Sequence, residues 1–280
     1  MRIKSLEHVE ISKIVECFNV SFADYFVKMP SSVDFWEERW KAARVDYSLS
    51  FGMFDGYDLV GFIINGVDYK NGFLTAFNTG TGVIPAYRGQ KIVKQIYDFA
   101  IPVLLVKGIQ SCSLEVIVGN DKAIKAYKSV GFKISRTLKC YSGELQIGDS
   151  DNLMIEKKPI ENVQWGKLPN QKYYSWDFQK NAIEILNKDY QYFQVLENQQ
   201  LLGYFILNPE SGTLAQVEIE NSDTKEAWLK MFSAIKKVTT YLKINNVDDR
   251  LIFKNEAIKE AGLKNTIDQF EMDYIIKSEN

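Results

Sequence analysis

The stretch GVIPAYRGQKIVKQIYDF, residues 82–99, joins a predicted β-strand to a long predicted helix through a turn at Arg88-Gly89. Apolar residues recur at helical spacing after the turn, and the helix is expected to end at Lys107-Gly108. A helix start offers unpaired backbone N–H groups and the positive end of a dipole, so this turn is a candidate phosphate site. The alternative is an ordinary connection that binds nothing. The expected apolar side of the helix consists of Ile92, Ile96, Phe99 and Val103.

Upstream of this stretch, two helices are expected to precede a sheet. The first covers about residues 11–26, and the second follows a cap at Ser31 or Ser32. Short β runs between residues 48 and 84 then alternate with turns, which predicts a three-stranded antiparallel meander. Downstream, a strand leads into a helix opened by Asn120 or Asp121 and closed before Gly131-Phe132. Two more strands, near 133–141 and 152–157, are expected to complete a first domain.

The remaining sequence predicts a second, smaller α/β domain after an aperiodic linker at 159–169. A strong helix is expected to start at Asp223, with Glu226 completing a capping box and an apolar side that continues to Leu242. The expected strands are 190–197, 201–207, 213–220, 250–253 and 270–276, with a short helix at 255–262.

The two halves carry similar sequences. LVGFII at 59–64 matches LLGYFI at 201–206, and both follow a turn after a preceding strand. The sequence therefore predicts an internal duplication, with two unrelated sheets as the alternative. A looser match pairs Asn120, Ala123, Ile124, Gly131 and Phe132 with Asn255, Ala257, Ile258, Gly262 and Leu263.

Composition excludes several function classes. Lys and Arg number 34 against 36 Asp and Glu, without a block of like charge, so no nucleic-acid partner is expected. The three cysteines form no CxxC pair, and one histidine, His8, excludes histidine triads and multi-histidine metal sites. The charged N-terminus lacks a secretory apolar region, and no apolar run is long enough to span a bilayer. We expect a cytoplasmic protein without a metal or a membrane partner.

Two motifs, VIPAYRG at 83–89 and LEVIVGNDKAIKAYKSVGF at 114–132, together resemble the GCN5-related N-acetyltransferase (GNAT) superfamily. The resemblance covers about Leu49 to Leu145 and implies a GNAT fold of the α/β (α+β) class, with a mixed, mostly antiparallel sheet flanked by helices. It also implies acetyl-CoA as co-substrate. In that family the strand ending at Val83 and Ile84 pairs with the pantetheine arm, and the following turn wraps the pyrophosphate. The turn residues are Arg88, Gly89, Gln90, Lys91, Ile92 and Val93.

The turn departs from the family pattern R/QxxGxG/A, because Lys91 and Val93 occupy the two glycine positions. Their side chains fill space that glycine leaves open, although the backbone amides remain available. The second motif is intact and adds Asn120 and Ala123 to the cofactor-binding residues that the resemblance implies.

The resemblance also assigns catalytic roles. Tyr127 is the expected general acid for the leaving thiolate, since a phenol has a pKa of about 10 and a thiol about 8.5. The alternative for Tyr127 is a packed core tyrosine. Glu115 is the expected general base for the amine, and its rival is a water held by backbone carbonyls at the splayed strand. Direct transfer needs no enzyme nucleophile, so Cys112 and Cys140 are expected to be buried small residues.

The predicted function is therefore an acyl-CoA-dependent N-acetyltransferase with residues 1–158 as the catalytic domain and 159–280 as a degenerate GNAT-like copy. The acceptor is expected to be a small-molecule or peptide amine, and the alternatives are a non-catalytic acyl-CoA-binding regulatory module and a peptide N-terminal acetyltransferase. The second half is expected to cover the acceptor pocket or to form a homodimer interface. Candidate acceptor-binding residues are Asp24, Tyr25, Trp36, Asn78, Tyr141 and Glu144.

Overall fold

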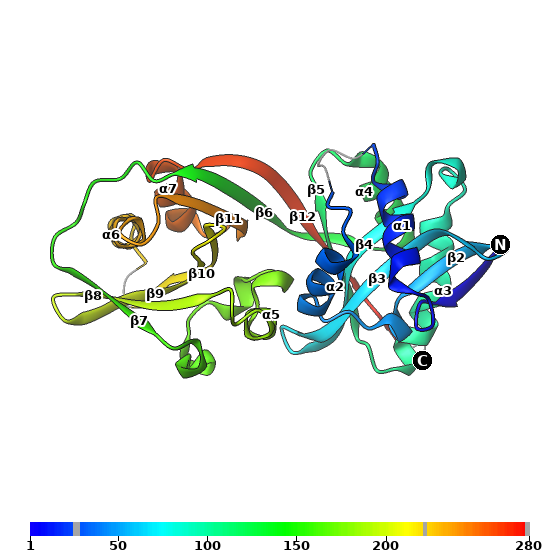
Figure 1. Cartoon of the computed structure of the whole chain (residues 1–280), viewed down its shortest axis with the longest axis horizontal. Helices are drawn as coiled ribbons and strands as arrows, with labels where there is room; N and C mark the ends of the chain where they lie inside the picture. The colour runs from blue at the N-terminus through cyan, green and yellow to red at the C-terminus, as the bar shows by residue number, and fades with distance from the viewer. Residues whose placement is uncertain (25–28, 221–222, 278–280) are drawn as a thin grey trace. The chain divides into compact units, whose positions relative to one another are not determined.

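The computed structural model describes residues 1–24, 29–220 and 223–277. By its contacts the chain forms two compact units (Figure 1). The first unit consists of Met1–Ser135 together with the segment that begins at Glu271, and the second consists of Arg136–Phe270. The boundary predicted after residue 158 separates the two GNAT-like halves of the sequence and not these compact units. That boundary stays a prediction.

The first unit contains the predicted meander, in which β2, β3 and β4 pair antiparallel. β1 adds to β2 in antiparallel fashion, and this strand was not expected because its sequence is short and polar. β4 and β5 are parallel, and β12 follows β5 in the sheet. The strands are β1 (Arg2–Ser5), β2 (Phe51–Asp55), β3 (Asp58–Lys70), β4 (Phe73–Val83), β5 (Ser111–Ile117) and β12 (Lys264–Ile275).

Four helices flank this sheet: α1 (Ile11–Ser21), α2 (Val33–Ala42), α3 (Ile92–Val106) and α4 (Asp121–Val130). The hydroxyl of Ser32 accepts a hydrogen bond from the Phe35 N–H and caps α2, as expected. α1 and α2 pack against one face of the sheet around Phe18, Trp36 and Trp40. α1 ends at Ser21, before the expected position.

The buried side of α3 differs in part from the prediction. Ile92 and Ile96 are buried, but Phe99 is 43% exposed and its ring packs edge-on against Phe51. Tyr97, Ala100 and Leu104 complete the buried side instead. The helix is apolar over most of its length, so spacing alone did not identify the inner face.

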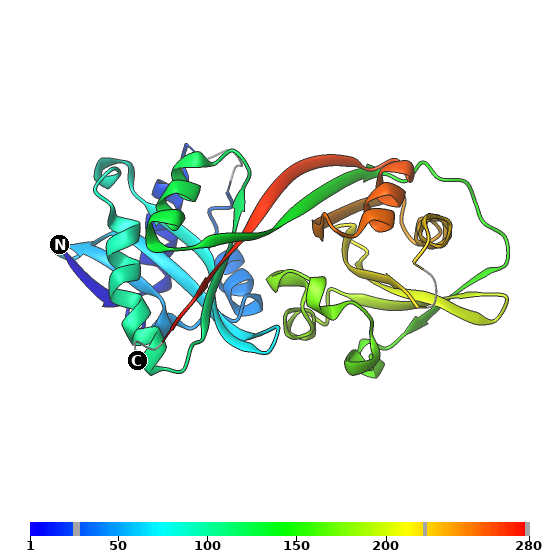
Figure 2. The same cartoon turned by 180° about the vertical axis from the view of Figure 1, so that it is seen from behind.

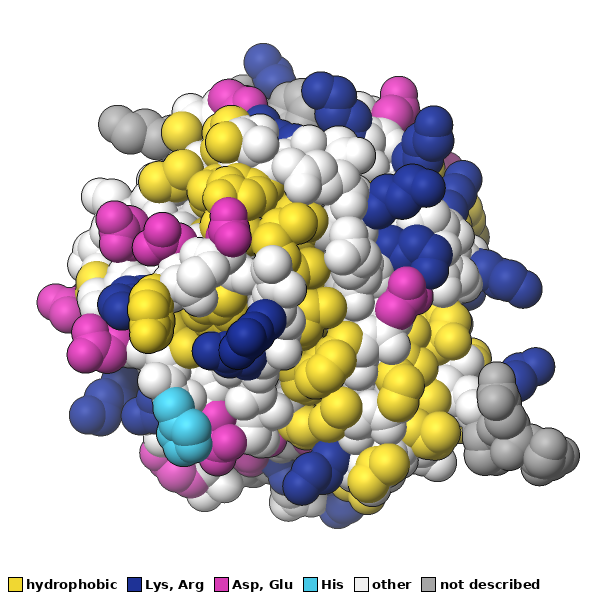
Figure 3. Space-filling view, turned by 90° about the vertical axis from the view of Figure 1, so that its right-hand side faces the viewer, with side chains coloured by type: hydrophobic (Ala, Val, Ile, Leu, Met, Phe, Trp, Pro, Cys, Tyr) yellow, Lys and Arg dark blue, Asp and Glu magenta, His cyan; other side chains and the backbone are white. Residues whose placement is uncertain are grey.

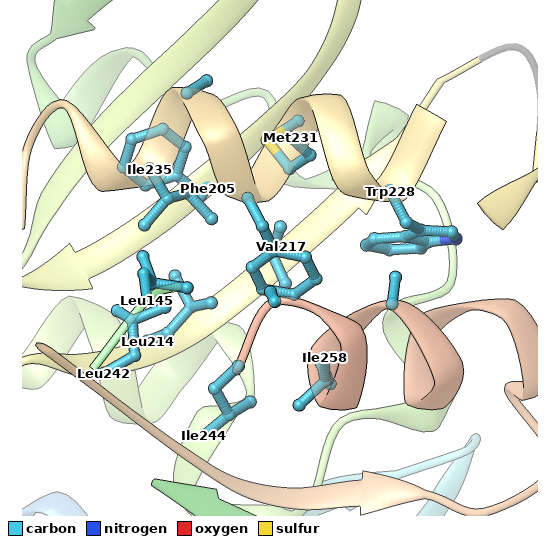
Figure 4. Packing of buried hydrophobic residues seen from close by; sticks show 14 of the residues in the cluster. Leu145, Phe205, Leu214, Val217, Trp228, Met231, Ile235, Leu242, Ile244 and Ile258 are labelled. Atoms are coloured by element: carbon cyan, nitrogen blue, oxygen red, sulfur yellow. The ribbon is translucent and has the colours of Figure 1, made fainter. Parts of the chain in front are cut away.

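The second unit repeats this arrangement. β8 (Gln191–Glu197), β9 (Gln200–Asn208) and β10 (Thr213–Ile219) form an antiparallel meander, and β10 is parallel to β11 (Tyr241–Asp248). α6 (Lys225–Lys236) and α7 (Ile252–Glu260) contribute Trp228, Met231, Ile235 and Ile258 to one core (Figure 4). The other elements are β6 (Lys133–Glu144), β7 (Leu153–Lys158) and α5 (Lys180–Ile185).

Two expectations for the second unit are wrong. α6 is capped by Thr224, whose hydroxyl accepts from the Ala227 N–H, whereas the Asp223 carboxylate accepts from the indole of Trp228. The strand expected at 250–253 is also wrong, because Arg250 lies in a turn and α7 begins at Ile252; the strand of this region is β11, which contains Leu242, a residue expected on the preceding helix.

The strand that follows each of the helices α4 and α7 in sequence does not pair with the strand that precedes the same helix. β6 follows α4 but pairs with β11, and β12 follows α7 but lies beside β5 (Figures 1 and 2). β7 pairs with β8 and so belongs to the second unit. The expectation that two strands after residue 132 complete the first domain is therefore corrected: the C-terminal segment from Glu271 completes it.

The predicted linker is a packed segment of 3₁₀ turns rather than an irregular connection. Val163 is buried, and Trp165 and Leu168 pack beside it on a cluster that includes Tyr204 and Ile206 of β9. Single buried side chains separated by tight turns have no period, so the sequence pattern did not reveal this packing.

Candidate acyl-CoA site

The parallel strands β4 and β5 of the first unit diverge toward their C-terminal ends, and this divergence is called the cleft of the first unit. The parallel pairing begins at Thr75 and Ser111 and ends at Asn78 and Leu114, although β4 continues to Val83 and β5 to Ile117. The backbone edges beyond this point face each other without strand pairing. This is the divergence that the family resemblance implies for the pantetheine arm.

The backbone N–H and carbonyl of Val83 point toward this opening. The Ile84 N–H donates to the Val60 carbonyl on β3 at 3.0 Å. Because backbone groups alternate between the two edges of a strand, the N–H and carbonyl of Val83 face the other edge, toward β5. The Val83 carbonyl accepts from Nε of Arg88 at 3.2 Å.

The turn between β4 and α3 is built by backbone conformation. A 3₁₀ turn at Pro85–Tyr87 leads to Gly89 at φ 80° and to Lys91, the N-cap of α3, at φ 59° and ψ 26°. Lys91 therefore stands in the left-handed conformation that glycine adopts most readily, which explains the glycine of the family pattern at this position. The first intrahelical bond runs from the Gln95 N–H to the Lys91 carbonyl. The N–H groups at the start of α3 precede that bond and point out of the helix.

An ion pair holds the turn to the end of α1. The Arg88 guanidinium donates to both carboxylate oxygens of Asp24, at 2.6 and 2.8 Å, and to the Ser21 carbonyl at 2.9 Å. Hydrogen bonding from Arg88 lowers the pKa of Asp24 to about 2. Asp24, predicted to bind the acceptor, is thus engaged with the turn.

The second motif shapes the N-terminus of α4. Asn120 is the N-cap, and its side-chain oxygen accepts from the Ala123 N–H at 3.3 Å. Tyr127 is 8% exposed, and its ring lies edge-on to Phe132, with 5.9 Å between centroids. Phe132 in turn contacts Tyr97 of α3, with 5.2 Å between centroids. Tyr127 therefore belongs to an aromatic cluster on the α3 and α4 side of the sheet.

Glu115 and Tyr127 lie on opposite faces of the sheet. Asn78, at the end of the β4–β5 pairing, donates to the Tyr97 hydroxyl at 2.6 Å and so points toward α3. Alternation along β5 places Ser113 and Glu115 on the other face, where Ser113 accepts from Lys70 at 2.7 Å. Glu115 is the first residue of β5 beyond the paired region, and it is half-buried.

The remaining acceptor candidates lie in several parts of the structure. Trp36 is buried among Phe18 and Trp40, and its indole donates to the Pro30 carbonyl, which supports a packing role. Tyr141 and Glu144 belong to the second unit, where the Tyr141 hydroxyl donates to Asn255. Tyr25 lies outside the described residues. Asn78 is buried beside the cleft and also holds the Gly80 N–H.

Sequence reasoning missed Tyr97. Its hydroxyl lies inside the unit, and burial together with nearby Tyr127 raises its pKa well above the usual value. The only signal in the sequence was its place three residues before Ala100 in an apolar helix, and this does not distinguish a core tyrosine from a polar contact to Asn78.

Other chemistry is less well supported in the described part of the chain. Burial raises the pKa of the Cys112 thiol to about 12, so this cysteine does not ionise readily. Within residues 1–24, 29–220 and 223–277, no group of three His, Cys, Asp or Glu side chains is arranged to hold a metal ion. In the same residues, no helix is long and apolar enough to cross a membrane.

One face of the first unit carries exposed apolar side chains among lysines and arginines (Figure 3). On α3, Leu105 is 38% and Val106 85% exposed. Scattered apolar residues are normal on protein surfaces, so the homodimer stays a prediction.

The cleft has a counterpart in the second unit. Gly61 of β3 pairs with Met53 and Val83, and Gly203 of β9 pairs with Val195 and Ile219 in the same register. A one-residue bulge precedes each glycine at the same position. The Glu220 N–H donates to the Leu202 carbonyl at 3.0 Å, as Ile84 does to Val60. These matches confirm the duplication.

The structure corrects the predicted match between the short helices. The N-cap of α7 is Leu251, at φ −80° and ψ 74°, and Asn120 has φ −81° and ψ 66°. Each helix then reaches a left-handed glycine, Gly131 or Gly262, after the same number of residues. Leu251 is therefore the counterpart of Asn120, whereas Asn255 lies one turn inside the helix. The same alignment gives Ile258 as the counterpart of Tyr127.

The second cleft is filled by the chain itself. β10 and β11 pair at Thr213 and Lys243 and diverge beyond them, and Tyr174 occupies the opening. The Tyr174 hydroxyl lies 3.0 Å from the Val217 carbonyl and 2.7 Å from the Glu218 carboxylate, and it accepts from the Val217 N–H at 3.0 Å. Burial and Glu218 raise its pKa well above the usual value.

Charged groups close the rest of this cleft. Lys254 is 4% exposed and donates to the Val217 carbonyl at 2.8 Å and to Glu218 at 2.9 Å. The Asn170 amide donates to the other oxygen of Glu218 at 2.8 Å. The remaining cavity of about 20 Å³ has room for about one water molecule.

Comparisons with known proteins agree with this arrangement. Residues 14–132 match the Acetyltransferase (GNAT) family. No curated protein matches the sequence. Several solved structures match nearly the whole chain at identities that show the fold alone.

Three of these structures are representative. A putative acetyltransferase from Pyrococcus horikoshii is 14% identical, with 99% of this chain and 89% of that chain covered and a TM-score of 0.63. A tandem GNAT protein from the clavulanic acid biosynthesis pathway is 10% identical, with 100% and 99% covered and a TM-score of 0.66. A GCN5-related N-acetyltransferase from Sphaerobacter thermophilus is 9% identical, with 99% and 96% covered and a TM-score of 0.68.

Residues 14–132 therefore carry a match to the GNAT family, and the chain as a whole has the fold of GNAT proteins. More particularly, it consists of two GNAT-like halves, and the sequence of the first half carries the family match.

Proposed function

We propose that this protein is an acyl-CoA-dependent N-acetyltransferase, which moves the acetyl group of acetyl-CoA to a primary amine by direct transfer in the first half. The observation that carries the proposal is the divergence of the parallel strands β4 and β5 beyond Asn78 and Leu114, at the end of which a left-handed turn opens α3. This arrangement offers a backbone edge for an extended amide chain and a helix start for phosphate oxygens.

Different residues of this segment are proposed to bind different parts of acetyl-CoA. The Val83 N–H is a donor for a pantetheine amide. The Val83 carbonyl is an acceptor for a pantetheine amide once it releases the hydrogen bond from Arg88. The backbone amides from Gly89 to Val93 are the proposed donors to the pyrophosphate, and the Lys91 ammonium adds positive charge. When bound, acetyl-CoA supplies a thioester whose carbonyl the amine attacks. Asn120 and Ala123 shape the wall of the channel at the start of α4.

The two catalytic side chains approach this position from opposite faces of the sheet. Glu115 is the proposed general base, because it lies at the mouth of the divergence on the face away from α3 and α4. Tyr127, on the α4 side, is the proposed general acid and delivers its hydroxyl proton to the departing thiolate. The acceptor amine then enters on the Glu115 side, and the leaving thiol forms on the Tyr127 side.

The second half is proposed to be a degenerate copy that binds no acyl-CoA. Three differences support this: Leu251 replaces the capping Asn120, Ile258 replaces Tyr127, and Tyr174 fills the cleft. The hydroxyl of Tyr174 bonds to both polar groups of one β10 residue, as an amide of a bound pantetheine would do on β4.

The direct test is acetyl-CoA turnover, followed through released thiol, against a panel of primary amines and of peptides with open N-termini. Wild-type protein is expected to acetylate at least one amine. Tyr127→Phe is expected to lower kcat roughly 10²- to 10⁴-fold while acetyl-CoA still binds. The matched control is Tyr87→Phe, which removes an exposed hydroxyl bonded to Asp55. No transfer to any amine by wild type, despite acetyl-CoA binding, would contradict the transferase and favour a binding module.

A further inference from the structure

The side chain of Arg88 lies across the end of β4. Its Nε donates to the Val83 carbonyl at 3.2 Å, and this carbonyl points toward the cleft of the first unit. Its two terminal nitrogens donate to the Asp24 carboxylate at 2.6 and 2.8 Å, and one of them also donates to the Ser21 carbonyl at 2.9 Å. Every nitrogen of the guanidinium is therefore engaged, and one of its acceptors is a group that the proposed cofactor needs.

The end of α1, which holds Arg88, is packed closely on β4. Ser21 is 7% exposed and lies on Gly82, where a Cβ atom would stand 2.7 Å from that of Ser21. This distance is too short for two carbon atoms without a bond between them, so the absence of a side chain at Gly82 allows the approach. A planar guanidinium bound through both terminal nitrogens has little freedom to rotate. Asp24 and Ser21 therefore keep the Nε of Arg88 directed at the Val83 carbonyl.

We propose that the ion pair between Arg88 and Asp24 is an autoinhibitory contact, which keeps the Val83 carbonyl occupied until an acyl-CoA displaces the guanidinium. This inference rests on the proposed function and describes the regulation of the same site. Only those molecules in which Arg88 has left Val83 can bind the pantetheine arm through both backbone groups. The apparent affinity is reduced by their fraction, so a contact that leaves about one molecule in ten open lowers the affinity about tenfold.

The charge of the ligand separates this contact from a simple electrostatic effect. Asp24 is ionised at neutral pH, because hydrogen bonding from Arg88 lowers its pKa to about 2. Removing this anion beside the turn also reduces the repulsion of any anionic ligand. Acetyl-CoA carries a diphosphate, whereas acetyl-pantetheine has the same pantetheine arm and no charge. Release of the Val83 carbonyl raises the affinity for both ligands, but reduced repulsion raises the affinity for acetyl-CoA alone.

Calorimetric titration of the full chain with each ligand tests the proposal. Asp24→Ala is expected to lower the Kd about tenfold for acetyl-pantetheine and at least as much for acetyl-CoA. The Asp24 side chain is 64% exposed, so the variant is expected to fold. Asp55→Ala is the matched control, because the Asp55 carboxylate binds the same turn through the Tyr87 hydroxyl, at 2.7 Å, and not through Arg88. This control is expected to change the Kd for acetyl-pantetheine less than about twofold.

A double-mutant cycle shows whether Asp24 acts through Arg88. Arg88→Ala alone is expected to lower the Kd for acetyl-pantetheine about tenfold, because it also releases the Val83 carbonyl. In the Arg88→Ala background, Asp24→Ala is expected to change this Kd less than about twofold. The cycle uses the uncharged ligand because Arg88→Ala also removes a positive charge beside the proposed diphosphate site.

Three results would overturn the inference. They are an unchanged or raised Kd for acetyl-pantetheine in Asp24→Ala, a lowered Kd that is confined to acetyl-CoA, and an equal effect of Asp24→Ala with and without Arg88. Each of them leaves the proposed function intact if wild type binds acetyl-CoA and transfers its acetyl group. Failure of wild type and of every variant to bind either ligand would overturn the inference and the proposed function together.

Discussion

Replacing Met272 by alanine tests whether the C-terminal strand is an integral part of the first unit. Met272 is 0% exposed and lies on β12, which is the neighbour of β5, where Leu114 is 1% exposed. Shortening this side chain removes buried apolar surface and leaves a cavity between β5 and β12. The expected loss is about 2–5 kcal/mol of unfolding free energy, a large part of the roughly 5–15 kcal/mol of a typical domain.

The measurement is urea denaturation with and without saturating acetyl-CoA. Because acetyl-CoA is proposed to bind the first half, the transition that it shifts upward should be the one that Met272→Ala shifts downward. Ile275→Ala is the matched control, since this neighbour is 53% exposed and should change stability by less than about 0.5 kcal/mol. Equal effects of the two substitutions, or a loss confined to a transition that acetyl-CoA does not shift, would refute the placement of this strand.

Two further substitutions probe the two clefts. Lys91→Gly relieves a left-handed residue at φ 59° and is expected to stabilise the protein by about 1 kcal/mol in urea denaturation; a destabilised variant would contradict the strained turn. Tyr174→Phe strips the Val217 N–H of its partner and is expected to cost about 1–3 kcal/mol without creating a second acetyl-CoA site. Tyr173→Phe is the control for the second experiment, and a Tyr174→Phe protein as stable as this control would show that the hydroxyl does not hold the cleft closed.

The sequence pattern predicted those features that are determined by residues close to one another in the sequence. The meander, the Ser32 cap and the left-handed Gly131 after α4 are each set within a few residues, and the LVGFII and LLGYFI runs marked the duplicated strand. A cap or a turn has few alternatives, so its residues predict it well.

Pairing between distant strands was not predictable in the same way. β6 and β12 have similar amphipathic patterns. The sequence therefore does not reveal that β6 pairs with β11 and that β12 lies beside β5. The ion pair between Lys70 and Glu271 was overlooked for this reason, because Glu271 lies more than 150 residues after β5 in sequence. Asp24 and Trp36 were predicted as acceptor residues from their type; in the structure Arg88 binds Asp24 and Phe18 packs against Trp36, and their acceptor role stays a prediction.

The first half alone is proposed to bind acetyl-CoA, with the diphosphate of the ligand at the start of α3. Isothermal titration of the full chain with acetyl-CoA, and separately with acetyl-pantetheine, tests it most directly. We expect one acetyl-CoA per chain and an affinity at least about tenfold higher than that for acetyl-pantetheine, because the shorter ligand lacks the groups that the turn binds. Equal affinities, or two acetyl-CoA molecules per chain, would contradict it.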